Sequence, residues 1–154
     1  MQTKVNIRPA RADERLALIE LQRHASLASG TYREVLLANP EVIDLPLEQI
    51  EAGRVHVAEA GGAVLGFYAL LAGENGAAEL DGMFVDPTHW RQGIGHRLLQ
   101  EAEHQAVSEG ATLLCVTANP DALVFYQACG LTVVGEVQTQ FDVALRMQKK
   151  LPGK

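Results

Sequence analysis

The sequence predicts a mixed α/β fold, in which a largely antiparallel central sheet of about six or seven strands is flanked by about four helices. Strand-like and helix-like segments follow one another in the order β-α-α-β-β-β-α-β-α-β-β, read from their hydrophobic periodicity. The chain has 154 residues, and one domain usually has about 100–200. The composition, 47% hydrophobic and 21% charged, is typical of globular proteins. We therefore expect residues 1–154 to form a single domain.

The first third of the chain indicates one strand and three helical segments. Val5–Arg8 alternates polar and apolar residues, as a short strand does. Asp13 is suited to cap a helix that carries apolar residues at helical spacing and ends at Ser29. A second short helix is expected over 31–37, and a helical turn over 47–51, directly after a proline.

Three strands are expected in the middle of the chain, over 54–60, 63–72 and 77–85. The first two flank Gly61-Gly62, and a two-residue glycine turn is a strong hairpin signal. Asp86-Pro87 ends the third strand. The first half of the sheet is therefore expected to be antiparallel.

The last third indicates two helices and three strands. A helix is expected over 93–109, because apolar residues recur on one helical face and a glycine follows. The short apolar run 113–117 is typical of a strand that is buried on both faces. A helix over 121–129 then precedes a final antiparallel pair, 132–137 and 141–148.

Charge and cysteine content exclude several classes of protein. The chain has 13 Lys and Arg against 19 Asp and Glu, a net charge of −6, whereas nucleic-acid binding needs clustered basic residues. The longest uncharged apolar stretch, Ala63–Gly73, is too short to span a bilayer. Cys115 and Cys129 lie in apolar stretches and read as buried free thiols of a cytoplasmic protein. We expect no nucleic-acid partner and no membrane partner.

The five histidines show no metal-ligand spacing with cysteines or carboxylates, so no metal is expected. The most informative segment is instead the one from Val85 to Leu99, where a strand ends, a turn follows, and Gly93 and Gly95 open a helix. Free N–H groups and the dipole make a helix N-terminus favourable for anions, and Arg91 adds positive charge, as does Arg97. The segment therefore predicts a phosphate or pyrophosphate cradle.

Two common phosphate-binding motifs do not fit. A Walker A loop requires Gly-Lys-Ser/Thr, which this segment lacks. A dinucleotide fingerprint requires a third glycine, where the sequence has Leu98. A nucleotide-binding protein stays open as one hypothesis. An increase in the unfolding temperature with ATP or NAD, and not with CoA, would support it.

Two motifs in order resemble those of the GNAT superfamily of acyl-CoA-dependent N-acetyltransferases. Residues 90–95, Trp-Arg-Gln-Gly-Ile-Gly, resemble its signature Gln/Arg-x-x-Gly-x-Gly/Ala, with Trp90 as the one departure. Residues 119–131 resemble its Asn…Ala-x-x-Phe-Tyr-x-x-x-Gly-Phe segment, with Leu131 in place of the last phenylalanine. Residues 143–151 resemble its last strand, so the likeness covers almost the whole chain.

The resemblance implies a GNAT-like fold and acetyl-CoA as cosubstrate. It assigns the CoA pyrophosphate to backbone amides at the start of the helix, namely those of Arg91, Gln92, Gly93, Ile94, Gly95 and His96. It assigns the thioester carbonyl and the pantetheine arm to backbone N–H groups of Met83, Phe84 and Val85. Asn119 would contact the pantetheine arm, or cap the helix that follows it.

Acyl transfer to an amine needs a base for the amine and a proton donor for the thiolate. Strand periodicity places Glu79 and Asp81 on one face, opposite Leu80, and two neighbouring carboxylates can raise one pKa toward a useful value. The resemblance implies Glu79 as the base, because protein-lysine acetyltransferases of the superfamily keep their base at this position, with Asp81 as the alternate. Either carboxylate could act through a water. Tyr126 is a neutral phenol donor, and the resemblance gives its position the general-acid role.

The lead hypothesis is an enzyme that moves acetyl from acetyl-CoA to a primary amine by direct transfer in a ternary complex. A covalent cysteine route is less favoured, because no histidine lies near either cysteine in sequence. The alternative hypothesis is a non-catalytic CoA-binding regulatory or interaction domain. The acceptor is a small-molecule or peptide amine, with Tyr32, Arg33 and Phe141 as candidate lining residues. A homodimer is compatible with the sequence.

Overall fold

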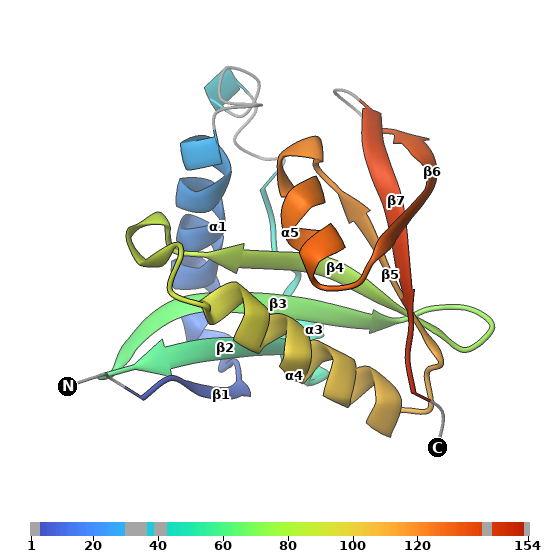
Figure 1. Ribbon diagram of the computed structural model, residues 1–154. Coiled ribbons are helices and arrows are strands. Elements are labelled where there is room, and N and C mark those ends of the chain that lie inside the picture. Colours follow the sequence, from blue (N-terminus) through green and yellow to red (C-terminus); the bar gives the residue numbers. More distant parts are fainter. Residues whose placement is uncertain (1–3, 30–36, 39–42, 140–142, 153–154) are drawn as a thin grey trace. The chain divides into compact units, whose positions relative to one another are not determined.

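The computed structural model describes residues 4–29, 37–38, 43–139 and 143–152 of the chain (Figure 1). The chain divides into two compact units that both draw on distant parts of the sequence. Unit 1 comprises Met1–Ala69 and Gly82–Glu101. Unit 2 comprises Leu70–Asp81 and Ala102–Lys154. Two strands, β3 (Ala63–Ala72) and β4 (Ala77–Val85), and one helix, α4 (Ile94–Ser108), contribute residues to both units. The prediction of a single domain therefore stays a prediction.

Seven strands form a sheet in the order β1-β2-β3-β4-β5-β7-β6. Their bounds are β1 Asn6–Pro9, β2 Val55–Ala60, β3 Ala63–Ala72, β4 Ala77–Val85, β5 Leu113–Ala118, β6 Thr132–Gln138 and β7 Val143–Lys150. The β4–β5 pair is parallel, whereas the β1–β2, β2–β3, β5–β7 and β6–β7 pairs are antiparallel. The predicted mixed, mostly antiparallel sheet is confirmed.

Four α-helices accompany the strands within the described residues, as predicted. They are α1 Arg15–Ser29, α3 Leu47–Glu51, α4 Ile94–Ser108 and α5 Leu123–Ala128. Single 3-10 turns precede three of them, namely η1 Ala12–Glu14, η3 Pro87–His89 and η4 Pro120–Ala122. No helix in the described ranges is long and apolar enough to cross a membrane.

In unit 1 the β2–β3 hairpin turns at Gly61 and Gly62, as predicted. Both glycines have positive φ, 58° and 82°, which the tight turn between right-twisted strands requires. A further glycine, Gly66, lies where two backbones approach closely. A Cβ on Gly66 would come within 2.7 Å of the Phe84 carbonyl oxygen and within 3.1 Å of the Leu98 side chain. Only a residue without a side chain fits between β3, the end of β4 and α4.

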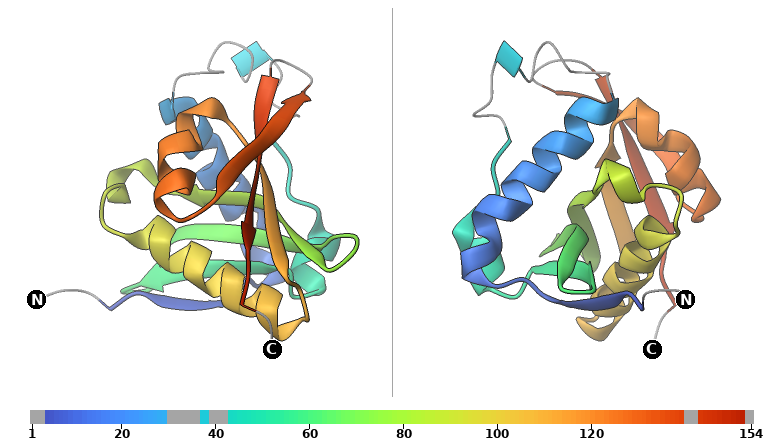
Figure 2. Two further views of the ribbon diagram at one scale, coloured as in Figure 1. Left: turned by 45° about the vertical axis from the view of Figure 1, so that its right-hand side comes forward. Right: turned by 90° about the vertical axis from the view of Figure 1, so that its left-hand side faces the viewer.

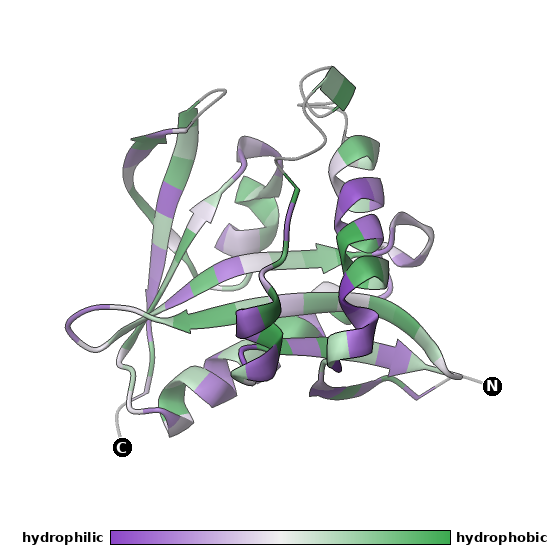
Figure 3. Ribbon diagram, turned by 180° about the vertical axis from the view of Figure 1, so that it is seen from behind, coloured by the Kyte–Doolittle hydropathy of each residue, from purple (hydrophilic) through white to green (hydrophobic). Residues whose placement is uncertain are grey.

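The core of unit 1 lies between α1 and strands β2 and β3. Leu18 of α1 is fully buried and packs in one cluster with Val57 and Phe67 of the strands. The two views of Figure 2 show α1 on one side of these strands and the start of α4 on the other. Hydrophilic residues occupy much of the rest of α1 (Figure 3). The apolar residues that predicted this helix therefore include one that packs in the core, as an amphipathic helix requires.

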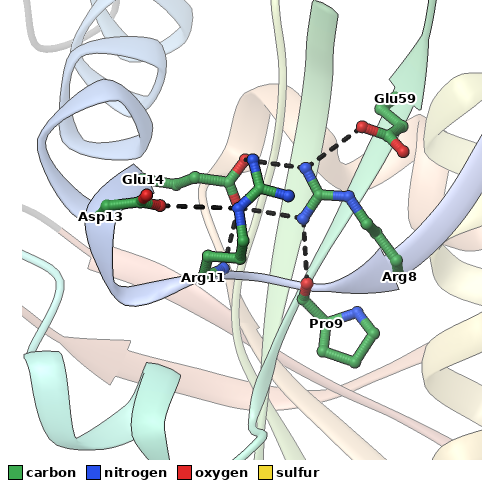
Figure 4. Close-up of polar contacts among 6 residues, drawn as sticks. All are labelled: Arg8, Pro9, Arg11, Asp13, Glu14 and Glu59. Carbon is green, nitrogen blue, oxygen red and sulfur yellow. Dashed lines mark hydrogen bonds and ion pairs between the residues drawn. The ribbon is translucent and has the colours of Figure 1, made fainter. Parts of the chain in front are cut away.

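The start of α1 differs from the prediction that Asp13 caps it. The chain first forms the turn η1, and Glu14 closes that turn, because its carboxylate accepts the Arg11 backbone N–H at 2.8 Å. The same carboxylate accepts two hydrogen bonds from the Arg8 guanidinium, at 3.0 and 2.8 Å, and Arg8 also pairs with Glu59 of β2 at 3.1 Å (Figure 4). Asp13 is instead an exposed partner of Arg11.

In unit 2 the first half of β4 pairs in parallel with β5, and β7 pairs with the other edge of β5. β6 pairs with β7, and every one of its seven residues is exposed. Cys115 of β5 is buried, but Cys129, which follows α5, is only half-buried, and both are free thiols. Burial of the second thiol was therefore a wrong prediction.

The remaining elements follow the predicted order with small shifts. α5 begins at Leu123, because the turn η4 takes up the first predicted helical residues. The described part of β7 runs from Val143 to Lys150, so the predicted strand start at Phe141 lies outside the described residues. The predicted helix over 31–37 also lies outside them, apart from Leu37.

Candidate active site

The end of β4 is tied tightly into unit 1. The backbone N–H of Asp86 donates to the Leu65 carbonyl of β3 at 2.8 Å. The Asp86 carboxylate then accepts the backbone N–H of Thr88 at 3.0 Å and its hydroxyl at 2.8 Å. These hydrogen bonds, the backbone one first, lower the pKa of Asp86. The turn η3 therefore starts from a fixed point on the sheet.

The turn ends with Trp90, whose indole N–H donates to the carbonyl oxygen of Val85 at 2.8 Å. The hydrogen bond links the last residue of β4 to the residue before the glycine loop. The Trp90 side chain nevertheless remains 42% exposed. Sequence analysis identified Trp90 only as a departure from the family signature and did not foresee this contact.

The glycine loop, residues 91–93, alternates between left-handed and right-handed backbone conformations. Arg91 has φ 65°, and Gly93 has φ 81°, whereas Gln92 between them has a negative φ. Alternation of right- and left-handed residues turns successive N–H groups toward a common point, as in anion-binding nests. A left-handed conformation is uncommon for an arginine and costs about 1–3 kcal/mol. The strained residue therefore lies within the predicted pyrophosphate cradle.

α4 begins directly after this loop. Ile94 and Leu98 are buried and fix the helix, while Arg91, Gln92 and His96 are exposed. Gly95 is half-buried. Arg97 donates from its guanidinium to the Val5 carbonyl at 3.1 Å. The predicted second cation of the cradle is thus already engaged with the segment that precedes β1.

The last residues of β4 belong to unit 1 and are partly accessible to solvent. Met83, Phe84 and Val85 are all half-buried. The Phe84 ring packs against Phe67, with 5.5 Å between ring centroids, so this side chain belongs to the core. Only the backbone of Phe84 can serve the role that the resemblance implies for it, and this agrees with the expected use of N–H groups.

In unit 2 the candidate base Glu79 is bound by Arg146 of β7. The two guanidinium nitrogens of Arg146 donate to the two oxygens of Glu79, each at 2.7 Å. Arg146 also donates to the Thr117 hydroxyl of β5 at 3.0 Å. The hydrogen bonds to Glu79 raise the pKa of Arg146. A bidentate pair of this kind is among the stronger charge-assisted interactions in proteins.

Asp81, the other candidate base, lies two residues along the same strand and is exposed. Leu80 between the two carboxylates is 1% exposed, so the predicted alternation along β4 is confirmed. The expectation that Glu79 and Asp81 act on each other as neighbouring carboxylates stays a prediction. Arg146, whose guanidinium binds both oxygens of Glu79, was not foreseen from the sequence.

Tyr126 lies on α5 and is 6% exposed. Burial raises the pKa of the Tyr126 phenol above its ordinary value of 10. Its ring contacts Phe125 edge-on, with the centroids 5.3 Å apart. Asn119 acts as a cap, since its side-chain oxygen accepts the backbone N–H of Asp121 at 3.0 Å. Asn119 therefore caps the turn η4, whereas the N-cap position of the tyrosine helix α5 is at Ala122. A pantetheine contact of Asn119 stays a prediction.

The structure thus distributes the predicted residues over both units. Met83–Val85 and the loop residues 91–96 belong to unit 1, and Glu79, Asp81, Asn119 and Tyr126 belong to unit 2. Tyr32, Arg33 and Phe141 lie outside the described residues. Within the described part of the chain, no group of His, Cys, Asp or Glu residues could hold a metal ion.

Arg146 is the main residue that sequence reasoning missed. It lies 67 positions from Glu79 in the chain, within the segment that resembles the family's last strand, and that resemblance does not point to the pair. The one available hint was an arginine within the otherwise apolar run Val143–Met147, because such a residue usually finds an acidic partner.

The sequence profile of the Acetyltransferase (GNAT) family matches residues 21–131. No curated protein sequence matches the chain as a relative. Among solved structures, the PaiA N-acetyltransferase of Thermoplasma acidophilum in complex with coenzyme A is similar, with 23% identity, a TM-score of 0.78, and coverage of 96% of this chain and 99% of that chain.

Two further structures have the same fold. YncA of Salmonella typhimurium, solved with its cofactor acetyl-CoA, has 22% identity and a TM-score of 0.73, and the match covers 99% of this chain and 96% of that chain. The ribosomal-protein-S18-alanine N-acetyltransferase of Escherichia coli has 15% identity and a TM-score of 0.73, with coverage of 98% and 96%. At these identities the structural likeness shows a shared fold.

Proposed function

Because the chain belongs to the GNAT acetyltransferase family, we propose that it transfers an acetyl group from acetyl-CoA to a primary amine within a ternary complex. The observation that carries the proposal is the conformation of the loop 91–93, in which φ is positive at Arg91 and at Gly93 but not at the residue between them. This loop leads directly into α4 and lies inside the segment that the family profile matches. Such a loop supplies N–H groups for an anion, and acetyl-CoA carries a pyrophosphate. We assign the pyrophosphate to the amides of residues 91–96.

We assign the base to Asp81 in preference to Glu79. Both oxygens of Glu79 already accept short hydrogen bonds from Arg146, so protonation of Glu79 would break a charge-assisted pair. Asp81 is exposed, and its carboxylate can reach an amine directly or through a water. Glu79 and Arg146 would then position the strand that carries Asp81.

Tyr126 is the proposed hydrogen-bond donor to the departing thiolate. A buried phenol with a raised pKa is neutral at pH 7, so its O–H is available as a donor. Burial also makes the phenol a weaker acid, and a thiol has an ordinary pKa of about 8.5. We therefore propose that Tyr126 acts chiefly by stabilising the developing thiolate through a hydrogen bond.

The proposed step balances without an oxidant or a metal. Asp81 takes a proton from the ammonium form of the acceptor, and the freed nitrogen lone pair attacks the thioester carbonyl carbon. The resulting oxyanion is met by the N–H groups of residues 83–85, and the C–S bond then breaks as the carbonyl re-forms. The thiolate leaves and takes a proton from solvent to give CoA. The nitrogen of the product gives up its one excess proton to solvent and keeps the other as the amide N–H, and Asp81 returns its proton to solvent.

The protonation of the two cysteine thiols favours direct acetyl transfer over transfer through an acetyl-cysteine intermediate. Burial raises the pKa of the Cys115 thiol and, likewise, that of Cys129. A thiol with a raised pKa is a poor nucleophile, because the thiolate is the reactive form. We therefore propose that the acetyl group passes straight from CoA to the acceptor, which is a small-molecule or peptide amine.

The deciding experiment measures thiol release from acetyl-CoA with a panel of polyamines, amino acids, aminoglycosides and peptides. We expect release that depends on one class of amine, with initial-rate patterns that require both substrates to be bound together. Propionyl-CoA as the donor tests the choice of acyl group. Calorimetric binding of CoA without turnover for any amine would contradict the enzyme and favour a CoA-binding regulatory domain.

A further inference from the structure

We propose that Trp90 is a positioning residue for the cofactor cradle, which it holds in its anion-binding conformation through the hydrogen bond from its indole to Val85. This inference rests on the proposed function, because it assumes that the loop binds the pyrophosphate of CoA. It concerns the one position at which the sequence departs from the family signature. The residues that carry it all belong to unit 1.

The hydrogen bond closes a six-residue loop from Val85 to Trp90. At one end, the next residue, Asp86, is anchored to β3 through its N–H and to Thr88 through its carboxylate. At the other end, the Trp90 indole returns to the Val85 carbonyl at 2.8 Å, and the Trp90 N–H lies 3.3 Å from the Pro87 carbonyl. Side chain and backbone of Trp90 are thereby both fixed relative to the sheet.

The residue that follows this fixed point is the strained one. Arg91 has φ 65°, a conformation that a free arginine disfavours, and the alternation of hand across residues 91–93 depends on it. Trp90 itself is extended, with φ −63° and ψ 154°. A fixed Trp90 sets the direction in which the chain enters Arg91. We call the hydrogen bond from the Trp90 indole to the Val85 carbonyl the clamp. Without the clamp, Arg91 would relax to negative φ and turn its N–H away from the anion.

The exposure of Trp90 supports a role in the loop over a role in the core. Trp90 is 42% exposed, so it gains less free energy from burial than a core tryptophan does. Its indole N–H nevertheless has a hydrogen-bond partner. Gln or Arg, which the family signature has at this position, likewise carries an N–H donor on its side chain. The shared feature is thus a side-chain donor.

The experiment combines Trp90→Phe with two variants of the neighbouring residue. CoA and inorganic pyrophosphate are each titrated calorimetrically into the wild type and Trp90→Phe. Loss of one hydrogen bond predicts about three- to ten-fold weaker binding of both ligands. The KM for acetyl-CoA should rise by the same factor, and kcat at saturating acetyl-CoA should stay within two-fold.

The matched pair Arg91→Ala and Arg91→Gly separates conformation from charge. Both variants lack the guanidinium, but only glycine adopts positive φ freely. We expect Arg91→Gly to bind CoA more tightly than Arg91→Ala does. We also expect Trp90→Phe to weaken binding less when combined with Arg91→Gly than when combined with Arg91→Ala, because glycine does not need the clamp.

Each outcome has one meaning. Equal effects of Trp90→Phe in combination with either Arg91 variant, or wild-type affinity in Trp90→Phe itself, would overturn the positioning role and leave the proposed function intact. Absence of CoA binding by the wild type would overturn the proposed function, and this inference with it. Trp90 is the only tryptophan in the chain, so its fluorescence gives a second measurement on the wild type. Its emission should shift on saturation with CoA, and an unchanged emission would count against the inference.

Discussion

Arg146 binds Glu79 through two parallel hydrogen bonds of 2.7 Å, one from each terminal guanidinium nitrogen to each carboxylate oxygen. The pair joins β7 to β4 within unit 2, and a third hydrogen bond extends it to Thr117 of β5. Charge-assisted bidentate hydrogen bonds of this kind are stronger and more specific in geometry than neutral ones.

Asp81→Asn should lower kcat by about 100-fold, which is within the range for loss of a general base. Glu79→Gln should lower kcat by less than about ten-fold, because the amide oxygen of the new side chain can still accept a hydrogen bond from Arg146. Steady-state kinetics with the best acceptor amine measures both. Loss of activity in Glu79→Gln, together with full activity in Asp81→Asn, would return the role of base to Glu79.

Arg146→Met should lower the free energy of unfolding by about 1–3 kcal/mol, because it leaves the half-buried Glu79 carboxylate without its partner. The double variant Glu79→Gln/Arg146→Met should recover part of that loss. Urea denaturation measures each value. The pair Arg23–Glu20 supplies a control, because its carboxylate is 62% exposed and needs no partner to be solvated, so Arg23→Ala should cost less than about 0.5 kcal/mol. Equal losses at the two sites would contradict the prediction.

Tyr126→Phe should lower kcat by about 100-fold while the affinity for CoA stays within two-fold. The substitution removes the phenol O–H and keeps the ring that packs beside Phe125. Kinetics for turnover and calorimetry for CoA separate the two effects. Undiminished turnover would show that Tyr126 is a packing residue, and a large loss of CoA affinity would point to a binding role.

Stability should fall in acid because of Glu14. Hydrogen bonds from Arg8 lower the pKa of Glu14 from 4.5 to about 2. Between these values the unfolded chain binds the proton and the folded chain does not, so the stabilisation is complete above pH 4.5 and is lost toward pH 2. With allowance for solvent screening the loss is about 1–2 kcal/mol. Urea denaturation from pH 7 to pH 2 should show this fall, and Glu14→Gln should flatten it.

Gly66→Ala should destabilise unit 1 by about 1–3 kcal/mol, because a Cβ there would lie 2.7 Å from the Phe84 carbonyl oxygen. Gly135→Ala on β6 is the matched control. A Cβ at Gly135 meets nothing within 4 Å, so that variant should be neutral or slightly more stable. Thermal unfolding of both variants measures the difference. A neutral Gly66→Ala would mean that β3 and the end of β4 can separate without cost.

The strands were predictable where the sequence marks their ends. β3 and β4 have the expected bounds, because Gly61-Gly62 begins one and Asp86-Pro87 ends the other. Turn chemistry is local, so it can be read from neighbouring residues. The start of α1 was not predictable in the same way. Glu14 makes the closing contact with Arg11, and the same carboxylate also binds Arg8, six residues earlier in the chain, a combination that no capping pattern signals.

The candidate site was predictable as a set of motifs but not as a set of contacts. The glycine loop and the tyrosine helix carry local signatures, and the helices α4 and α5 begin within two residues of their predicted starts. The Glu79–Arg146 pair brings together residues far apart in the chain, and no periodicity encodes such a meeting. The Trp90–Val85 hydrogen bond spans only five residues, yet it depends on a side-chain rotamer that sequence patterns do not specify.

β6 has a consequence for how this sequence can change over generations. All seven of its residues are exposed, including Val133, Val134 and Val137, so none of its side chains is fully buried. Exposed substitutions usually alter stability by less than about 0.5 kcal/mol. Selection for stability therefore acts weakly on this strand. It can acquire new surface properties while the buried parts of the protein stay as they are.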